Sequence, residues 1–93
     1  MIYMKKSIII TDREYNGIIM IIDNAKAFGN TVKMYRKKQK ATQLQVAAIA
    51  NTGVRFISDL ENGKPSVQLD KALKVARLLG IRLEADIIEG SST

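Results

Sequence analysis

The sequence predicts a mainly helical domain that ends in a single β-strand. Between residues 23 and 80, apolar residues recur at spacings of three and four, which indicates helices that each bury one face. From Ile81 onward the period becomes two: Ile81, Leu83, Ala85 and Ile87 alternate with charged residues, as is typical of a strand. At 93 residues the chain has room for only a modest core, so we expect a partner copy to add stability.

The first two helices have clear starting points. Asp23 and Asn24 are N-cap candidates for a helix that runs from about Asn24 to Gln39. Its apolar stripe consists of Ala25, Phe28, Val32 and Tyr35. Thr42 then caps a second helix, Gln43 to about Ala50, in which Gln45 completes a capping box. The residues of this helix expected to face inward are Val46, Ala47 and Ala50.

Turn-forming residues separate the next two helices. Asn51-Thr52-Gly53 forms a tight connection to a third helix, Val54 to Glu61, which the segment Asn62-Gly63-Lys64-Pro65 ends. Ser66 is expected to cap a fourth helix, and Gly80 to end it in a left-handed conformation. The predicted apolar stripe of this fourth helix is Leu69, Leu73, Ala76 and Leu79.

These patterns divide the chain into an N-terminal extension (1–22), a helical domain (23–80), a strand (81–89) and a frayed tail (90–93). In the extension, two isoleucine-rich runs flank an Asp-Arg-Glu-Tyr-Asn-Gly break, which suggests a hairpin. A helix starting at Thr11, with Glu14 as its capping-box partner, is the competing interpretation. One strand cannot satisfy its backbone alone, so the C-terminal strand must pair with the N-terminal segment or with its twin in a second subunit.

Composition excludes most kinds of active site. The chain has no cysteine and no histidine, which removes thiol nucleophiles, the commonest metal ligand and the commonest general base. Since no nucleophile and base pair, metal cluster or phosphate-binding loop can be found, we expect no enzymatic activity, no metal and no cofactor. The longest apolar run, Ile18 to Ile22, is far shorter than the roughly 18 residues of a membrane span, so a cytoplasmic protein is expected.

The positive charge is concentrated in one segment. The net charge is +6, and a third of the basic residues lie close together, which creates a local field suited to a polyanion. These residues are Lys33, Arg36, Lys37, Lys38 and Lys40. A solvated helix face without a ligand is the other interpretation of such a cluster.

Two short helices joined by a three-residue turn, with a basic helix before them, describe a helix-turn-helix unit. The segment TQLQVAAIANTGVRFISDLENGKP, Thr42 to Pro65, resembles the phage-repressor and Xre-like helix-turn-helix family. More narrowly, GVRFISDLENGKPSVQLDKALKVARLLG, Gly53 to Gly80, looks like the HipB-type antitoxins, which are DNA-binding partners of HipA-type kinase toxins. The resemblance implies a homodimeric repressor that binds a palindromic double-stranded operator and neutralises a HipA-like serine/threonine kinase.

Two other functions remain open. One is a phage-type or restriction-controller regulator of the same fold without a toxin partner. The other is a protein-interaction module that has lost DNA binding.

The resemblance also implies roles for individual residues. In such folds the third helix lies in the major groove with its N-terminal residues at the base edges, which makes Val54, Arg55, Ser58 and Asp59 the expected readers. Arg55 can hold a guanine at O6 and N7, and Val54 can touch a thymine methyl group. Asp59 either accepts from a cytosine amino group or orients Arg55. For Phe56, packing in the core or between subunits is favoured over stacking on a base.

Other residues are expected to hold the phosphates or the fold. The candidates for phosphate contact are Thr42, Gln43, Thr52, Lys38 and Lys64, with Gln43 at the N-terminus of the second helix. The resemblance also implies that Arg36 pairs with Glu61 and so ties the first helix to the end of the third. An unpaired carboxylate beside the buried Leu60 would be costly, which favours this ion pair over a DNA contact.

The resemblance to HipB-type proteins implies that the C-terminal strands pair across a two-fold axis. The dimer strand is Ile81, Arg82, Leu83, Glu84 and Ala85. A ladder centred on Leu83 sets Arg82 opposite Glu84 of the twin, whereas one centred on Glu84 sets two glutamates face to face. Charge therefore favours the register centred on Leu83.

Overall fold

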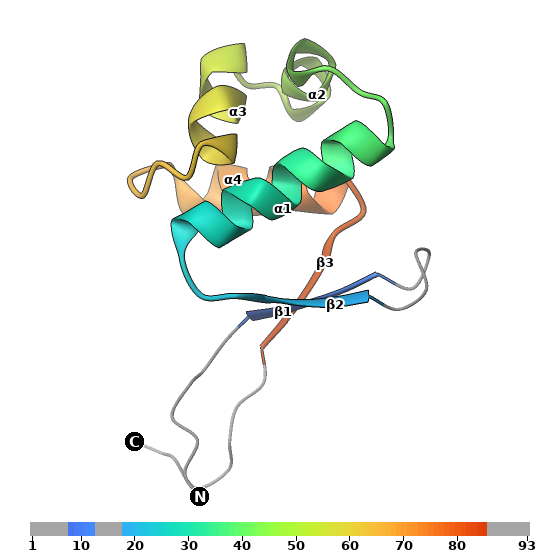
Figure 1. The fold of residues 1–93 in the computed structure, drawn as a ribbon. Helices are drawn as coiled ribbons and strands as arrows, with labels where there is room; N and C mark the ends of the chain where they lie inside the picture. The colour runs from blue at the N-terminus through green and yellow to red at the C-terminus, as the bar shows by residue number, and fades with distance from the viewer. Residues whose placement is uncertain (1–7, 13–17, 86–93) are drawn as a thin grey trace, which may run out of the picture.

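The computed structural model describes residues 8–12 and 18–85, in which four helices stand above a small antiparallel sheet (Figure 1). In chain order the elements are β1 (Ile8–Asp12), β2 (Ile18–Ile22), α1 (Ala25–Lys38), α2 (Gln43–Ala50), α3 (Val54–Glu61), α4 (Leu69–Leu78) and β3 (Arg82–Ala85). The predictions for the tail at 90–93 and for Ile87 fall outside the described residues. The predicted class, mainly helical with a C-terminal strand, agrees with these elements.

The sheet has the strand order β2-β1-β3, and both of its ladders are antiparallel. β1 pairs with β2 from Ile8↔Ile22 to Asp12↔Ile18, so the two isoleucine-rich runs lie side by side. β1 also pairs with β3, with Ile10 opposite Leu83. Of the two partners considered for the C-terminal strand, the chain therefore uses its own N-terminal segment. β3 is an edge strand of this sheet, and pairing across a dimer stays a prediction.

Local capping explains why α1 and α2 begin where they do. The backbone N–H of Ala27 donates to the side chain of Asn24 at 2.7 Å, which makes Asn24 the N-cap of α1. At α2 both halves of the predicted capping box are present: Gln45 N–H donates to Thr42 Oγ1 at 3.0 Å and Thr42 N–H donates to Gln45 Oε1 at 2.8 Å. Both helices thus have side-chain acceptors for backbone donors that lack a partner within the helix.

The two ends of α4 differ in how well they follow the prediction. Gly80 has φ +86°, and Ile81 N–H donates to Ala76 O at 2.9 Å, so the expected left-handed C-terminal turn is present. The prediction of Ser66 as the N-cap is wrong, because α4 begins at Leu69 after Gln68, whose side chain makes no capping hydrogen bond. Residues 65–67 instead form turns that carry the chain from α3 to α4.

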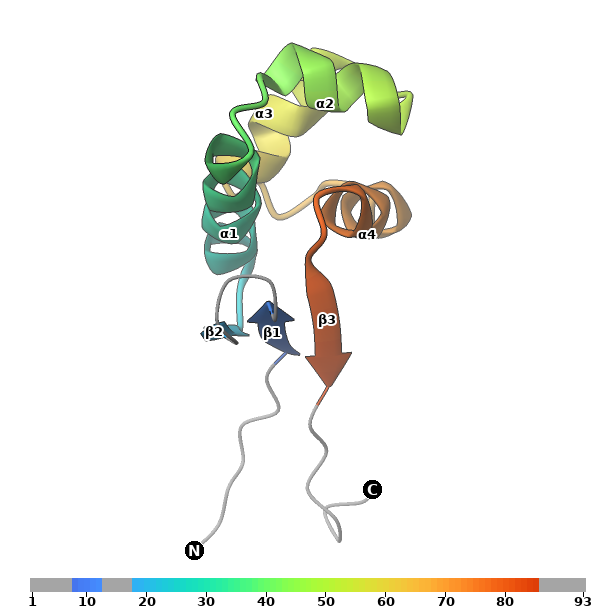
Figure 2. The ribbon, with the colours of Figure 1, turned by 90° about the vertical axis from the view of Figure 1, so that its right-hand side faces the viewer.

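The core lies where the four helices meet above the sheet. Its fully buried members come mainly from α1, α3 and α4, and the largest of them are Tyr35, Ile57, Leu60, Val32 and Val75. Val46, Ala47 and Ala50 of α2 are buried as predicted. Figure 2 shows α2 and α3 together above α1 on one side and α4 on the other.

The predicted apolar stripe of α4 is only half right. Ala76 and Leu79 are buried, together with Ala72 and Val75. Leu69 is 68% exposed and Leu73 is 37% exposed, so Ala72 and Val75 take their places in the buried stripe. The spacing of three and four is satisfied by both sets, and packing against α2 and Ile81 selects the one with the smaller side chains.

Candidate nucleic-acid interface

The connection between α2 and α3 is compact and fixed by backbone geometry. Asn51 adopts the left-handed conformation with φ 58° and ψ 51°, which asparagine tolerates better than most residues. Thr52 N–H then donates to Ala47 O at 2.9 Å, and Val54 starts α3 immediately after Gly53. Small residues at 47 and 50 of α2 face the core, which allows α3 to pack closely against it.

The outer face of α3 is polar and open at its N-terminal half. Ile57 and Leu60 are buried, and the opposite side of the helix, which carries Arg55 and Ser58, therefore faces outward. Val54 is 44% exposed, Arg55 is exposed, and Ser58 and Asp59 are half-buried. The four predicted readers therefore share one continuous face, and Arg55 makes no ion pair with any described residue.

Asp59 has a different neighbour from the one suggested by sequence. Its carboxylate lies 3.6 Å from Lys64 Nζ, and Lys64 N–H donates to Asp59 O at 3.0 Å. An ion pair with both side chains this exposed contributes little stability, so it can be exchanged for other partners. The described contacts include no ion pair between Asp59 and Arg55.

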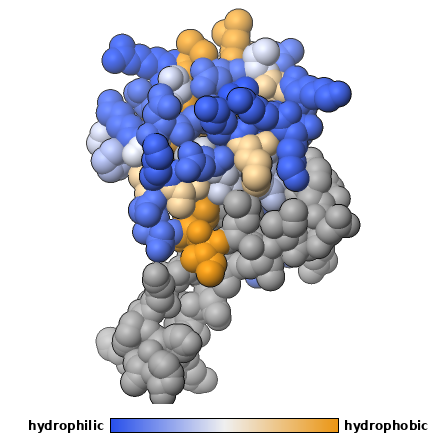
Figure 3. Space-filling view, viewed as in Figure 1, coloured by the Kyte–Doolittle hydropathy of each residue, from blue (hydrophilic) through white to orange (hydrophobic). Residues whose placement is uncertain are grey.

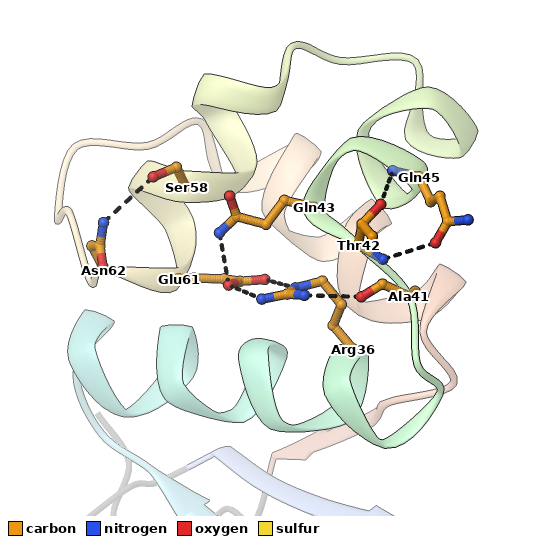
Figure 4. A network of polar contacts seen from close by, with 8 residues as sticks. All are labelled: Arg36, Ala41, Thr42, Gln43, Gln45, Ser58, Glu61 and Asn62. Atoms are coloured by element: carbon orange, nitrogen blue, oxygen red, sulfur yellow. Dashed lines mark hydrogen bonds and ion pairs between the residues drawn. The ribbon is translucent and has the colours of Figure 1, made fainter.

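Arg36 of α1 and Glu61 of α3 form a buried ion pair (Figure 4). Arg36 donates to both carboxylate oxygens, through Nε to Oε2 and through Nη2 to Oε1 at 2.9 Å. Arg36 Nη1 also donates to Ala41 O at 2.9 Å, and Gln43 Nε2 donates to Glu61 Oε1 at 3.0 Å. This network, called the clamp below, joins α1, the loop after it, α2 and the last turn of α3.

The clamp changes the protonation of both charged members. Burial alone would raise the pKa of Glu61, but the hydrogen bonds from Arg36 and Gln43, with the charges of Arg36 and Lys33, hold this pKa below its ordinary value. The hydrogen bond to Glu61 raises the pKa of Arg36, although burial acts in the opposite direction. Both side chains therefore stay charged at neutral pH.

Acid should destabilise the domain through Glu61. Because the folded pKa is lower than the ordinary value of 4.5, the stabilisation is complete above pH 4.5 and is lost as the pH falls through the folded pKa. We expect the Tm of the wild-type protein to fall more steeply below pH 4.5 than the Tm of Glu61→Gln, as measured by circular dichroism. Equal slopes for the two proteins would mean that Glu61 does not contribute to the acid response.

The predicted phosphate contacts lie around the two short helices. Thr42 is exposed at the N-terminus of α2, Thr52 is half-buried in the turn, and Lys38 and Lys64 are exposed. The side-chain nitrogen of Gln43 points at Glu61 and its amide oxygen points away from it, so Gln43 is also part of the clamp (Figure 4). The space-filling view is largely hydrophilic over the face that carries α1, where Lys33 and Lys37 are exposed (Figure 3).

Two packing contacts fix the position of α3 on the domain. Phe56 is half-buried and packs against the core cluster, in keeping with the packing role expected for it. Gly29 of α1 is buried directly under the end of α3, where an added Cβ would lie 2.2 Å from Leu60 O and 2.8 Å from Glu61 O. A glycine in the middle of a predicted helix was the available signal for such a close approach.

The fold and this surface define a helix-turn-helix domain. The family model described as helix-turn-helix matches residues 32–85, and the chain belongs to this family. It is 43% identical over 56 residues to a helix-turn-helix-type transcriptional regulator of Sinorhizobium fredii, a match that covers 60% of this chain and 74% of that protein. It is 34% identical over 61 residues to the immunity repressor protein of Bacillus phage phi105, covering 66% of this chain and 42% of the repressor.

Two further observations concern the described parts of the chain only. Among residues 8–12 and 18–85, no helix is long and apolar enough to cross a membrane. Over the same ranges, no three acidic side chains are grouped as ligands for a metal ion.

Proposed function

We propose that this protein is a sequence-specific DNA-binding transcriptional repressor that reads its operator with the N-terminal half of α3. The observation that carries the proposal is the outward face of α3, on which Val54 and Arg55 are exposed and Ser58 and Asp59 are half-buried, on a helix tied to α1 by the buried clamp. Membership of the helix-turn-helix family and the likeness to a phage immunity repressor support the same function. No enzymatic step is part of it.

Each reader has a chemical match in the major groove. The guanidinium of Arg55 offers two parallel donors to O6 and N7 of a guanine, and Val54 fits a thymine methyl group. Asp59 accepts from a cytosine amino group once Lys64 turns from it toward a phosphate. Ser58, between them on the same face, donates to or accepts from either kind of base.

Phosphate contacts set the orientation of the domain on the duplex. The N-terminus of α2 presents backbone N–H groups beside Thr42 and Gln43, which suits a phosphate oxygen. Thr52, Lys38 and Lys64 surround the reading face and add contacts that do not depend on sequence.

The repressor acts as a homodimer on a palindromic operator. In this proposal the strand Ile81 to Ala85 pairs with its twin, as in the HipB-type proteins that residues 53–80 resemble. The charges of Arg82 and Glu84 favour the register centred on Leu83. Two copies of α3 then enter successive major grooves roughly 34 Å apart. The two-fold axis of the dimer coincides with that of the operator.

Two kinds of regulator with this fold differ in whether they also bind a toxin protein. The resemblance to HipB-type antitoxins supports a HipA-like serine/threonine kinase toxin as a second partner, with repression of a shared operon. The likeness to the phi105 immunity repressor supports a phage-type regulator without a toxin to the same degree. Tagged protein purified from its own host should retain a kinase in the first case and none in the second.

The reading role of Arg55 predicts a loss that depends on sequence. Arg55→Ala should weaken operator binding by about 1–3 kcal/mol and relax the preference at one base position. Lys38→Ala, which alters a phosphate contact, should weaken operator and random DNA alike. Fluorescence anisotropy with both DNAs over a range of salt concentrations measures this, since each lost phosphate contact lowers the log–log salt slope by about 0.9.

The contrary results are equally clear. An equal loss on operator and random DNA for Arg55→Ala would remove Arg55 from base readout. Binding of the wild-type protein that does not change with salt would favour an interaction module that has lost DNA binding.

A further inference from the structure

An apolar groove of about 430 Å³ opens on the side of the domain away from the α2–α3 turn. Its floor includes Ile22 of β2 and Leu83 of β3, and its walls come from α1, the loop before α4 and α4 itself. Phe28, Val67, Leu69 and Leu73 are among the residues that line it. None of the expected DNA contacts except Lys64 belongs to this lining.

Two of the leucines that line the groove are exposed to solvent in the single chain. Leu69 is 68% exposed and Leu73 is 37% exposed, although their neighbours Ala72 and Ala76 are buried. Burying apolar surface stabilises a complex by about 25 cal/mol for each Å². A partner that covered the exposed surface of these two leucines would therefore be stabilised by several times the thermal energy. A cluster of exposed apolar side chains beside an open groove is typical of an interaction site.

The groove is continuous with the edge strand of the sheet. Leu83 is half-buried and lines the groove from β3, while the opposite edge of β3 from β1 is not paired with any described strand. A strand that joins this edge therefore brings its alternate side chains next to Leu83 and the groove.

The charges of β3 are self-complementary. Arg82 and Glu84 flank Leu83 and lie 3.7 Å apart in the same chain. In an antiparallel ladder centred on Leu83, Arg82 lies opposite Glu84 of the partner subunit, and Glu84 lies opposite Arg82 of the partner subunit. Two copies related by a two-fold axis thus match in charge, and their two Leu83 side chains lie together on the groove side.

From this continuity and this charge match we propose that a second copy of the chain closes the groove. The α4 leucines, Leu69 and Leu73, together with Leu83, form the apolar centre of the dimer interface, with the β3 ladder at its edge. The inference rests on the dimer proposed above and assigns to it a second element, α4, as well as the groove. Exposure of Leu69 and Leu73 is then a property of the separated subunit only.

The test compares two matched pairs of leucines. In Leu69→Gln/Leu73→Gln both groove leucines become polar without a change of net charge, so non-specific DNA affinity stays the same. The control is Leu44→Gln/Leu78→Gln, because Leu44 is 67% exposed and Leu78 is 45% exposed and neither lines the groove. Sedimentation equilibrium should show a dimer dissociation constant at least about tenfold higher for the groove variant and unchanged for the control.

Circular dichroism should give a folded spectrum for both variants, since all four leucines reach solvent and none belongs to the buried core cluster. Fluorescence anisotropy with a single half-site and with the full palindrome distinguishes a defect in dimerisation from a defect in base recognition. The groove variant should bind the half-site like wild type and lose its extra affinity for the palindrome. Wild type that dimerises but binds no DNA would refute the repressor and leave the groove assignment standing.

Three results would overturn the groove assignment. They are a wild-type protein that stays monomeric at all concentrations, an equal shift for the groove and control variants, and a dimer that is unaffected by both. A groove variant that dimerises normally but fails to retain a copurifying kinase would give the groove to that partner instead.

Discussion

Replacing Glu61 with glutamine should destabilise the domain by about 3–5 kcal/mol, because it leaves the buried Arg36 without a counter-charge. Glutamine has nearly the same shape, so the loss reports charge and not volume. The 2% exposure of the Glu61 side chain and 10% exposure of the Arg36 side chain leave little water to solvate the remaining guanidinium. Since a small domain has only about 5–15 kcal/mol of stability in total, urea unfolding should show a large shift of the midpoint.

A second substitution makes this expectation specific. Arg36→Met alone should also be strongly destabilising, whereas Arg36→Met/Glu61→Met should recover part of the loss, because no buried charge is left unpaired. The recovery is incomplete, since Ala41 O and the Gln43 side chain lose their partners in the clamp. Additive losses from the two single variants would show that the two charges do not act as a pair.

Local signals explain why two helices could be placed from the sequence to the residue. Thr42 and Gln45 form a capping box from residues three apart, and the turn at Asn51 uses a residue that tolerates the left-handed conformation. Both features depend only on neighbours in the chain, so they are visible before the fold is known. As a result the bounds expected for the second and third helices are those of α2 and α3.

Features that depend on distant residues could be predicted only in part. The spacing in α4 allows either Leu69 and Leu73 or Ala72 and Val75 to face inward, and only the positions of α2 and Ile81 decide between them. The partner of Asp59 was missed for a similar reason: Lys64 comes within reach because the chain turns back after α3. The pairing of Arg36 with Glu61, 25 residues later, was expected from a family resemblance and not from spacing.

The sheet illustrates the same limit. Alternation identified the C-terminal strand, but no pattern within it distinguishes a partner in the same chain from one in a second subunit. The chain places β1 on one edge of β3 and leaves the other edge at the rim of the sheet. Both partners considered from the sequence can therefore be used at once, one on each edge.

At Gly29, α1 packs directly against the backbone at the end of α3. Gly29→Ala should destabilise the domain by about 2 kcal/mol or more, even though alanine is favoured over glycine within a helix by about 1 kcal/mol. The new Cβ would meet Leu60 O at 2.2 Å and Glu61 O at 2.8 Å. Both oxygens belong to the backbone and cannot turn aside like a flexible side chain, so α1 and α3 must separate.

Separation of the two helices should also weaken the clamp, because Arg36 lies on α1 and Glu61 on α3. Gly53→Ala is the matched control: a Cβ there has nothing within 4 Å and its φ of −79° suits alanine, so only the modest cost of a poorer N-cap for α3 is expected. Urea unfolding should therefore give a midpoint slightly below that of wild type for Gly53→Ala and a much lower one for Gly29→Ala. If both variants unfolded like wild type, α1 would not need to approach α3 this closely, and the rigid support proposed for the reading face would be lost.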